Sequence, residues 1–173
     1  MGQIDYIAKV VNNLTTKYGT RNPYEICKAL GIKIRYKDLG IDIKAYYFYQ
    51  SRIRNIVLST RVSESVQRIL VSHELGHDRL HQEMAMQKGF QEIALFDEAQ
   101  PAEYEANLFA AELLIDDDEL CTLLSDEEKS FFGVAQELSV PAELLDFKFR
   151  VFKRKGFRVC SPIVAHANYL RKI

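Results

Sequence analysis

The five residues from His73 to His77 constrain the fold of this chain more than any other segment. They read His73-Glu74-Leu-Gly-His77. Residues four apart lie on the same face of an α-helix, about one turn from each other. Two imidazoles placed in this way can bind one tetrahedral cation, and Zn²⁺ is the cation that best suits a His pair in a protein. The pattern therefore predicts a helix at a metal site.

Glu74 follows the first predicted ligand and is expected beside the metal without binding it. A carboxylate there can act as general base and take a proton from a water molecule that the metal activates. Apolar residues at helical spacing from Val62 to Leu70 support the helix. Gly76 costs about 1 kcal/mol relative to Ala inside a helix, and we expect it to let another segment approach closely. Because such short patterns also recur by chance, the prediction depends on a third ligand.

A third ligand must come from a second helix, because one helix cannot surround a metal ion. Residues 101–115 have the apolar spacing of such a helix, with a proline in the first turn. Glu103 could complete the ligand set, and the Asn107 amide, four residues on, could fix a ligand imidazole. Glu105 lies about 200° around the helix from Glu103, so only one of them can face the metal, and we favour Glu103. Glu112 is expected to be a solvated charge.

Together the two segments resemble the ImmA/IrrE family of small zinc metallopeptidases, which belong to the gluzincin type and occur in bacteria and on their mobile elements. The resemblance rests on the pentapeptide at 73–77 and on Glu-Tyr-Glu-Ala-Asn-Leu-Phe-Ala-Ala-Glu-Leu-Leu at 103–114. It implies zinc held by His73, His77 and a Glu of the second segment, with Glu74 as base. Family members often follow the Leu-Leu pair with Met-Pro, whereas Ile-Asp stands here. That departure concerns the end of the helix and leaves the ligands unchanged.

The resemblance implies a zinc-dependent endopeptidase that cleaves a helix–turn–helix repressor and thereby regulates a mobile element or a stress response. The alternative is a regulatory module that keeps zinc without catalysis and binds a repressor or DNA. The presence of Glu74 disfavours this alternative, because a purely structural metal site has no use for a base.

The remaining patterns predict an α+β fold: one mainly helical domain, residues 1–173, with a small three-stranded sheet of antiparallel type beside the metal helix. Helices are expected at about residues 4–19 and 23–30, and strands at about 31–36, 41–49 and 53–58. The gluzincin resemblance implies that an extended substrate pairs with an exposed edge strand. Asn55 to Ser59 is the predicted edge.

Further predictions concern residues around the expected cleft. A tyrosine between Tyr46 and Tyr49 could stabilise an oxyanion, although alternating aromatics more often serve packing. Residues 82–100 are expected to form a loop or short helix that could cover the cleft. His81 lies about 12 Å along the helix from the first ligand, too far to share its metal, and is expected at the surface or behind a ligand. A transition-state role for His166 is weighed and not favoured.

Residues 131–158 have the outline of a helix–turn–helix, with helices at 131–138 and 142–152 around Ser-Val-Pro. A basic run begins in the second helix: Lys148, Arg150, Lys153, Arg154, Lys155 and Arg158. One interpretation is DNA contact by a recognition helix. We favour two packed helices with a solvated basic face, because the phenylalanines of 147–152 fit a core and the net charge is only −1. DNA is therefore not the expected partner.

The composition is that of a globular intracellular protein. With 173 residues, 47% of them hydrophobic, the chain can bury a proper core. Cys27, Cys121 and Cys160 are odd in number and lack Cys-x-x-Cys spacing, which favours reduced thiols. Neither a signal-peptide pattern nor an apolar run of about 18 residues occurs. A cytoplasmic protein without a membrane partner is expected.

Overall fold

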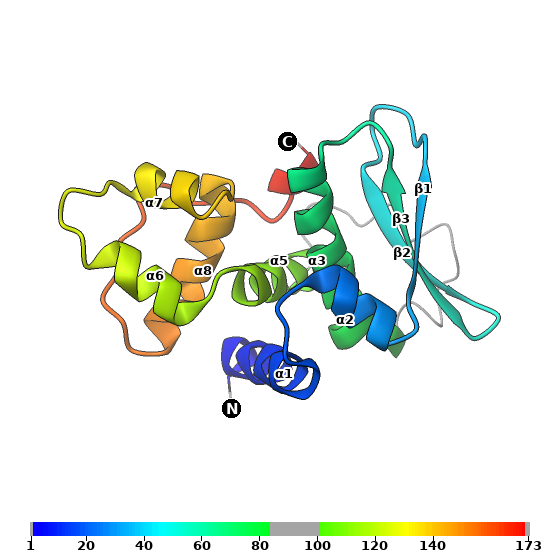
Figure 1. The fold of residues 1–173 in the computed structure, drawn as a ribbon, viewed down its shortest axis with the longest axis horizontal. Helices are drawn as coiled ribbons and strands as arrows, with labels where there is room; N and C mark the ends of the chain where they lie inside the picture. Colours follow the sequence, from blue (N-terminus) through cyan, green and yellow to red (C-terminus); the bar gives the residue numbers. More distant parts are fainter. Residues whose placement is uncertain (1, 84–100, 172–173) are drawn as a thin grey trace.

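In the computed structural model, which describes residues 2–83 and 101–171, the chain is arranged around helix α3 (Glu64–Leu80). The other elements are α1 (Gln3–Tyr18), α2 (Pro23–Ala29), β1 (Lys33–Lys37), β2 (Ala45–Gln50), β3 (Ile53–Ser59), α5 (Pro101–Leu114), α6 (Asp117–Leu124), α7 (Phe131–Glu137), α8 (Ala142–Arg154) and the 3-10 helix η2 (Tyr169–Arg171). The sheet lies on one side of α3, and α6, α7 and α8 form a group at the opposite end of the molecule (Figure 1). The predicted fold class, mainly helical α+β with a three-stranded sheet, is confirmed.

Local chemistry sets several helix ends. α1 stops at Gly19, whose φ of 66° is left-handed and therefore suits glycine. Asn22 caps α2 by accepting the backbone N–H of Tyr24, and Pro23 occupies the first turn, where its missing N–H does no harm. Asp116 caps α6 in the same way through two backbone N–H groups. These signals are local, and the sequence therefore predicts these helix boundaries to within a few residues.

The sheet is mixed, whereas an antiparallel type was predicted, and its strand order also corrects the predicted edge. The order is β1-β3-β2, with β3 parallel to β1 and antiparallel to β2. Residues 55–59, predicted as the exposed edge, lie in the central strand and are all buried. The physical reason is the nearly continuous apolar run of Ile56-Val-Leu58, which is the pattern of a strand with neighbours on both sides.

The outer edge of β2 carries a row of backbone groups that point away from the sheet. The N–H of Ser59 donates to the carbonyl of Lys44 at 2.8 Å, which makes these two residues a hydrogen-bonded pair. Hydrogen-bonded positions alternate along an antiparallel strand. Residues 45, 47 and 49 therefore direct their N–H and C=O groups away from β3, and in the described residues no strand pairs with this edge.

Helices α3 and α5 approach each other most tightly at Gly76. A Cβ atom at this position would lie 3.1 Å from the Cα of Ala106 and 3.2 Å from the Cβ of Phe109. Such contacts are shorter than ordinary van der Waals separations, so only glycine fits without displacement. The expectation that this glycine lets a second segment approach is confirmed, and the second segment is the helix that carries Glu103.

A cluster of buried charges joins α5 to α6 and α8. The Nζ of Lys148, whose side chain is 0% exposed, lies 2.6 Å from Glu112 and 2.5 Å from Asp117. Lys155 contacts the same two carboxylates, each at 2.5 Å. The expectation that Glu112 is a solvated charge is wrong, because α8 covers this face of α5 and supplies two ammonium groups. Pairing and hydrogen bonds let Lys148 and Glu112 stay buried, while Asp117 and Lys155 remain partly in contact with water.

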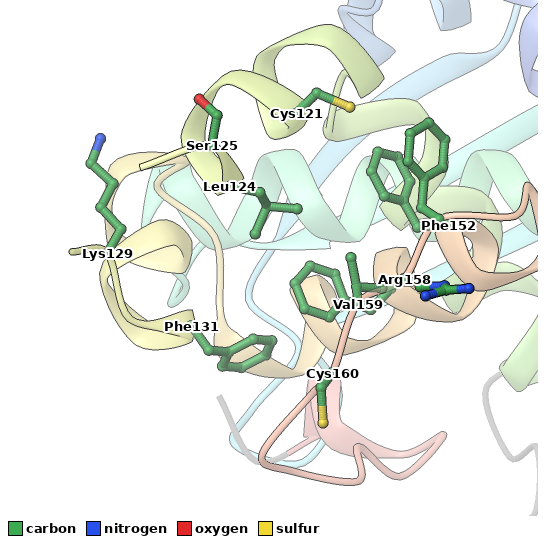
Figure 2. A pocket seen from close by; sticks show the side chains of 11 residues that line it. Cys121, Leu124, Ser125, Lys129, Phe131, Phe152, Arg158, Val159 and Cys160 are labelled. Carbon is green, nitrogen blue, oxygen red and sulfur yellow. The ribbon is translucent and has the colours of Figure 1, made fainter. Parts of the chain in front are cut away.

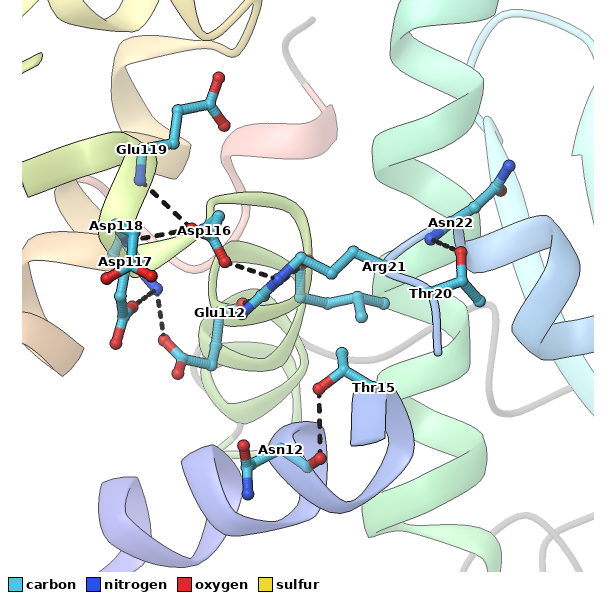
Figure 3. A network of polar contacts seen from close by, with 12 residues as sticks. Asn12, Thr15, Thr20, Arg21, Asn22, Glu112, Asp116, Asp117, Asp118 and Glu119 are labelled. Atoms are coloured by element: carbon cyan, nitrogen blue, oxygen red, sulfur yellow. Dashed lines mark hydrogen bonds and ion pairs between the residues drawn. The ribbon is translucent and has the colours of Figure 1, made fainter. Parts of the chain in front are cut away.

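Arg21 extends this network to the end of α5, as Figure 3 shows. Its guanidinium donates to the backbone carbonyls of Glu112 and Leu113 at 2.9 and 3.2 Å. The same side chain pairs with Asp116 at 3.0 Å. A cation therefore satisfies the last carbonyls of α5 and also fixes the residue that caps α6.

The basic run in α8 is largely neutralised within the fold. Besides the two lysines, Arg150 pairs with Asp146 at 2.6 Å and Arg154 with Asp5 at 2.8 Å. Residues 144–149, 151 and 152 of α8 are buried, so most of this helix packs into the core. Helices occur where the helix–turn–helix outline predicts them, but the expected solvated basic face is wrong for Lys148, which is enclosed by α5 and α6.

A pocket of about 480 Å³ lies between α6, α7, α8 and the segment that follows α8 (Figure 2). Its walls are mainly aromatic and aliphatic, from residues that include Phe131, Phe149, Phe152 and Phe157. None of the residues that line it belongs to α3 or α5. The pocket is therefore separate from the residues that the sequence analysis singled out.

Two further expectations concern membrane-spanning helices and the segment that could cover the cleft. None of the helices in residues 2–83 and 101–171 has the length and apolarity that a bilayer crossing requires. The predicted cover of the cleft, residues 82–100, falls almost wholly outside the described residues.

We expect Lys148→Ala to lower the free energy of unfolding by about 3 kcal/mol, because it removes the fully buried ammonium and leaves the buried Glu112 carboxylate paired with Lys155 alone. Urea denaturation followed by circular dichroism measures the change. Lys153→Ala, an exposed lysine on the same helix, is the control and should stay within about 0.5 kcal/mol of the parent. Equal small losses in both variants would contradict the structural role given to Lys148.

Candidate metal centre

Three side chains from two helices converge in the middle of the molecule. The Nε2 atoms of His73 and His77 lie 3.1 Å apart. The two carboxylate oxygens of Glu103 each lie 3.2 Å from one of these nitrogens. Both histidines are buried, and the group satisfies the geometric requirements for holding a metal ion.

The imidazole of His73 is fixed from behind by Asn107. Its Nδ1 lies 2.9 Å from the Oδ1 of the amide, while the amide Nδ2 donates to the carbonyl of Ala167 at 2.6 Å. Because Oδ1 can only accept, Nδ1 of His73 must carry the proton. The neutral ring then offers its Nε2 lone pair toward Glu103.

The imidazole of His77 is fixed by a second relay. Its Nδ1 lies 3.2 Å from Nδ1 of His81, whose Nε2 lies 3.1 Å from a carboxylate oxygen of Glu105. With Nε2–H donated to Glu105, neutral His81 accepts at Nδ1, so His77 donates there and keeps a bare Nε2. His81 therefore lies behind His77, one of the two predicted ligands, and Glu105 faces His81.

This pattern of hydrogen bonds leaves three electron-pair donors facing one another. Two imidazole lone pairs and one carboxylate would repel each other unless a positive charge lies between them. Ligand atoms around tetrahedral Zn²⁺ are separated by about 3.3–3.6 Å, given metal–ligand distances of about 2.0–2.2 Å. The observed separations of 3.1 and 3.2 Å are slightly shorter, so small movements would bring the three groups to that geometry. A His₂Glu set also leaves the fourth position for water or substrate, as catalytic rather than structural zinc sites do.

The protonation states agree with this arrangement. Burial disfavours the imidazolium form of His73, but the hydrogen bond and charge of Glu103 outweigh it and raise the pKa of His73. Burial lowers the pKa of His77 to about 4. Burial acts to raise the pKa of Glu103, but both histidines hold it far below its usual range. At neutral pH His77 is therefore neutral and Glu103 ionised, the forms that bind a metal. The raised pKa of His73 reflects the attraction of the Glu103 carboxylate for positive charge at this position.

Glu74 lies at the outer edge of β2. Burial raises the pKa of its carboxyl to about 7, the charge of Glu103 adds to the shift, and a backbone hydrogen bond from Tyr47 opposes it. Tyr47 is one of the residues whose N–H points away from β3, so the carboxylate sits beside the row of outward-facing backbone groups. A carboxyl that titrates near neutrality is suited to accept and return a proton.

A buried carboxylate that the sequence analysis missed ties α3 to the sheet. Asp78, next to His77, is 0% exposed and accepts the hydroxyl of Tyr47 at 2.8 Å. Arg54 and Arg79 also contact it, at 3.4 and 2.5 Å. Tyr47 is therefore engaged in this anchor and is no candidate for the predicted oxyanion role. The signal was present, because an aspartate on the inner side of a helix demands partners.

Comparison with known proteins decides the family. The family model described as the IrrE N-terminal-like domain matches residues 27–150. The chain belongs to the ImmA/IrrE family of metallopeptidases. It is 33% identical over 147 residues to "Uncharacterized immunity region protein 2" of Bacillus phage phi105, a match that covers 85% of this chain and 91% of the relative. It is 27% identical over 143 residues to "Metallopeptidase ImmA" of Bacillus subtilis (strain 168), which covers 80% of each chain.

In this member of the ImmA/IrrE family, the structure brings together the side chains that the sequence analysis singled out. His73, His77 and Glu103 form the converging set, and Asn107 holds a histidine from behind. That these residues bind zinc, and that Glu74 is the base, is proposed below. His166 is exposed, and its carbonyl accepts the N–H of Tyr169 at 3.2 Å; its role in a transition state stays a prediction.

We expect Gly76→Ala to weaken binding of Zn²⁺, because the added methyl group pushes α5, and with it Glu103, away from α3. Overpacking of this kind typically costs about 1–3 kcal/mol of stability. Competition with a chromogenic chelator measures the affinity, and urea denaturation the stability. Gly133→Ala is the matched helical control, because its nearest neighbour is the Ser130 Oγ at 3.4 Å, an ordinary contact. If Gly76→Ala binds Zn²⁺ as tightly as the parent, the close approach of α3 and α5 does not determine the position of Glu103.

We expect Glu74→Gln to stabilise the metal-free protein at pH 8 by up to about 3 kcal/mol and to have little effect near pH 4.5. The folded-state pKa of about 7 lies above the ordinary value of 4.5, so ionisation costs stability as the pH rises through this window, and the neutral amide removes the cost. Urea denaturation in the presence of a chelator at both pH values measures it. Glu127→Gln, at an exposed carboxylate, controls for the loss of charge; an equal difference between Glu74→Gln and the parent at both pH values would refute the burial argument.

Proposed function

We propose that this protein is a zinc-dependent endopeptidase. The observation that carries the proposal is the convergence of two bare imidazole nitrogens and one carboxylate beside a buried glutamate. Zn²⁺ held by His73, His77 and Glu103 would supply Lewis acidity that polarises a scissile carbonyl and lowers the pKa of water. Membership of a metallopeptidase family supports this choice over a purely structural site.

In this mechanism Glu74 acts as general base and then as general acid. Its carboxylate takes a proton from the attacking water and later delivers it to the amine that leaves. A pKa of about 7 suits both steps near neutral pH. Asn107 and His81 keep the two ligand histidines in one tautomer and one orientation, so the site needs little rearrangement during the reaction.

The substrate segment is proposed to bind as an extended strand at the outer edge of β2. The backbone groups of residues 45, 47 and 49 point outward along this edge. The N–H of Tyr47 bonds to Glu74, so the C=O of Tyr47 and the groups of residues 45 and 49 are the ones proposed to pair with the substrate. Added strands gain main-chain hydrogen bonds there irrespective of sequence, and side-chain contacts then provide selectivity. Because Tyr47 bonds to Glu74, a peptide on this edge runs directly past the proposed base.

The proposed substrate is a helix–turn–helix repressor, and the proposed role is regulation of a mobile element or stress response. The resemblance drawn from the two motif segments implies this role. The similarity to an immunity region protein of a Bacillus phage supports an association with a mobile element. A protein substrate also agrees with a site at a strand edge, which recognises polypeptide backbone.

The decisive experiment measures zinc content and repressor cleavage together, for the parent protein and for Glu74→Gln. Zinc in both, with cleavage of a co-encoded repressor by the parent alone, is expected. The variant keeps the three ligands, so the loss of cleavage isolates the base from metal binding. His73→Ala, which removes a ligand, should lose zinc as well as cleavage.

Other outcomes separate the alternatives. Zinc in both proteins without cleavage by either would favour a non-catalytic module that binds a repressor or DNA. A Glu74→Gln protein that retains full cleavage would exclude this residue as the base. A parent protein that binds no zinc at micromolar concentration would overturn the proposal as a whole.

A further inference from the structure

The segment that follows α8 reaches back to the candidate metal centre. Figure 1 shows it leaving the α6–α8 group toward the middle of the molecule. Its residues lie beyond the family match, which stops at residue 150. It nevertheless contributes a group to the site, because the carbonyl of Ala167 accepts the Asn107 amide at 2.6 Å.

This carbonyl decides which way the Asn107 amide faces. A carbonyl oxygen only accepts, so the NH₂ end must point toward Ala167 and the oxygen toward His73. Without the carbonyl, the buried amide could turn over and present its NH₂ to Nδ1 of His73. The imidazole would then carry its proton on Nε2, and a protonated nitrogen cannot bind a metal.

The segment is held in place by a clip on α8. The carboxylate of Asp146 accepts the backbone N–H of Ala165 at 3.1 Å, and the guanidinium of Arg150 donates to the carbonyl of the same residue at 2.7 Å. The two side chains also bond to each other at 2.6 Å. The backbone N–H and C=O of Ala165, two residues before Ala167, are therefore both hydrogen-bonded to side chains of α8.

Apolar contacts hold the other side of Ala167. Tyr169 and Leu170 are buried, and the ring of Tyr169 packs 5.7 Å from that of Phe147. The guanidinium of Arg150 stacks on the ring of Phe147, 4.4 Å from the ring centre. The carbonyl that meets Asn107 thus lies between a polar clip and an aromatic anchor, both centred on α8.

We propose that residues 161–170 form a positioning segment of the metal centre: docked by the Asp146–Arg150 clip, they fix the Asn107 amide and thereby present Nε2 of His73 to the metal. The proposal rests on the zinc function proposed above. In this view, the affinity for the metal depends on whether residues 161–170 are docked. Anything that releases the segment lowers metal affinity without touching a ligand.

The test compares the full-length parent with Asp146→Ala, Asn107→Asp and the double variant. Affinity for Zn²⁺ is measured by competition with a chromogenic chelator, and docking by hydrogen exchange of the amides of residues 165–170. Asp146→Ala should lose amide protection and bind Zn²⁺ at least about tenfold more weakly. Arg154→Ala, which removes the other arginine–aspartate pair of α8 and lies away from the segment, should bind as the parent does.

The double variant isolates the tautomer argument from general destabilisation. An aspartate at position 107 offers only acceptors to His73, whichever way it turns. In the Asn107→Asp background, release of the clip should therefore change Zn²⁺ affinity by no more than about twofold. An equal loss in both backgrounds would refute the role of the amide.

The remaining outcomes are also decisive. Suppose that the parent binds Zn²⁺ and that Asp146→Ala loses amide protection but keeps its affinity. This result would overturn the positioning role of residues 161–170 and leave the proposed zinc function standing. Retained protection in Asp146→Ala would overturn the clip. A parent that binds no Zn²⁺ would instead overturn the proposed function. Should Asp146→Ala fail to fold, Arg150→Ala, at a partly exposed side chain, removes the other half of the clip and carries the same expectations.

Discussion

The close crossing of α3 and α5 is the contact on which the candidate metal centre depends. On α3 the two histidines lie three residues before and one residue after Gly76, and on α5 Glu103 and Asn107 lie at the same offsets from Ala106. Offsets of this kind place side chains on the flank of a helix just beside its contact point. The absence of a side chain at one glycine therefore sets the separation of all the converging groups.

Hydrogen-bonded side chains behind the two histidines keep the converging groups in one state. Each histidine of the set is backed by a hydrogen bond to a side chain, and that side chain is held by a further residue: Ala167 behind Asn107, and Glu105 behind His81. The buried ion pairs of Lys148 fix α5 itself against α8. A buried network whose members are all hydrogen-bonded makes the site rigid, because each group that moved away would leave a buried partner unsatisfied at a cost in free energy.

The sequence predicted what local spacing determines. The four-residue steps at 73–77 and 103–107 place side chains on one helix face, so the convergence follows once the two helices pack together. Strand order depends instead on pairing between distant segments, which is why the central strand was mistaken for an edge. The burial of Glu112 depends on which helix covers it, and the contact of Ala167 has no periodic signal at all. Residue types indicate chemistry, but the partners of a side chain come from tertiary structure.

The hydrogen bond between Asn107 and Ala167 spans 60 positions of the chain. Proteins are synthesised from the N-terminus, so both histidines and Glu103 leave the ribosome well before the carbonyl that fixes the Asn107 amide. The fully ordered site can therefore form only late, after the last helices have docked. On a growing chain, His73 and Asn107 lack the constraint that Ala167 supplies, so the ordered arrangement requires a segment 60 positions further along.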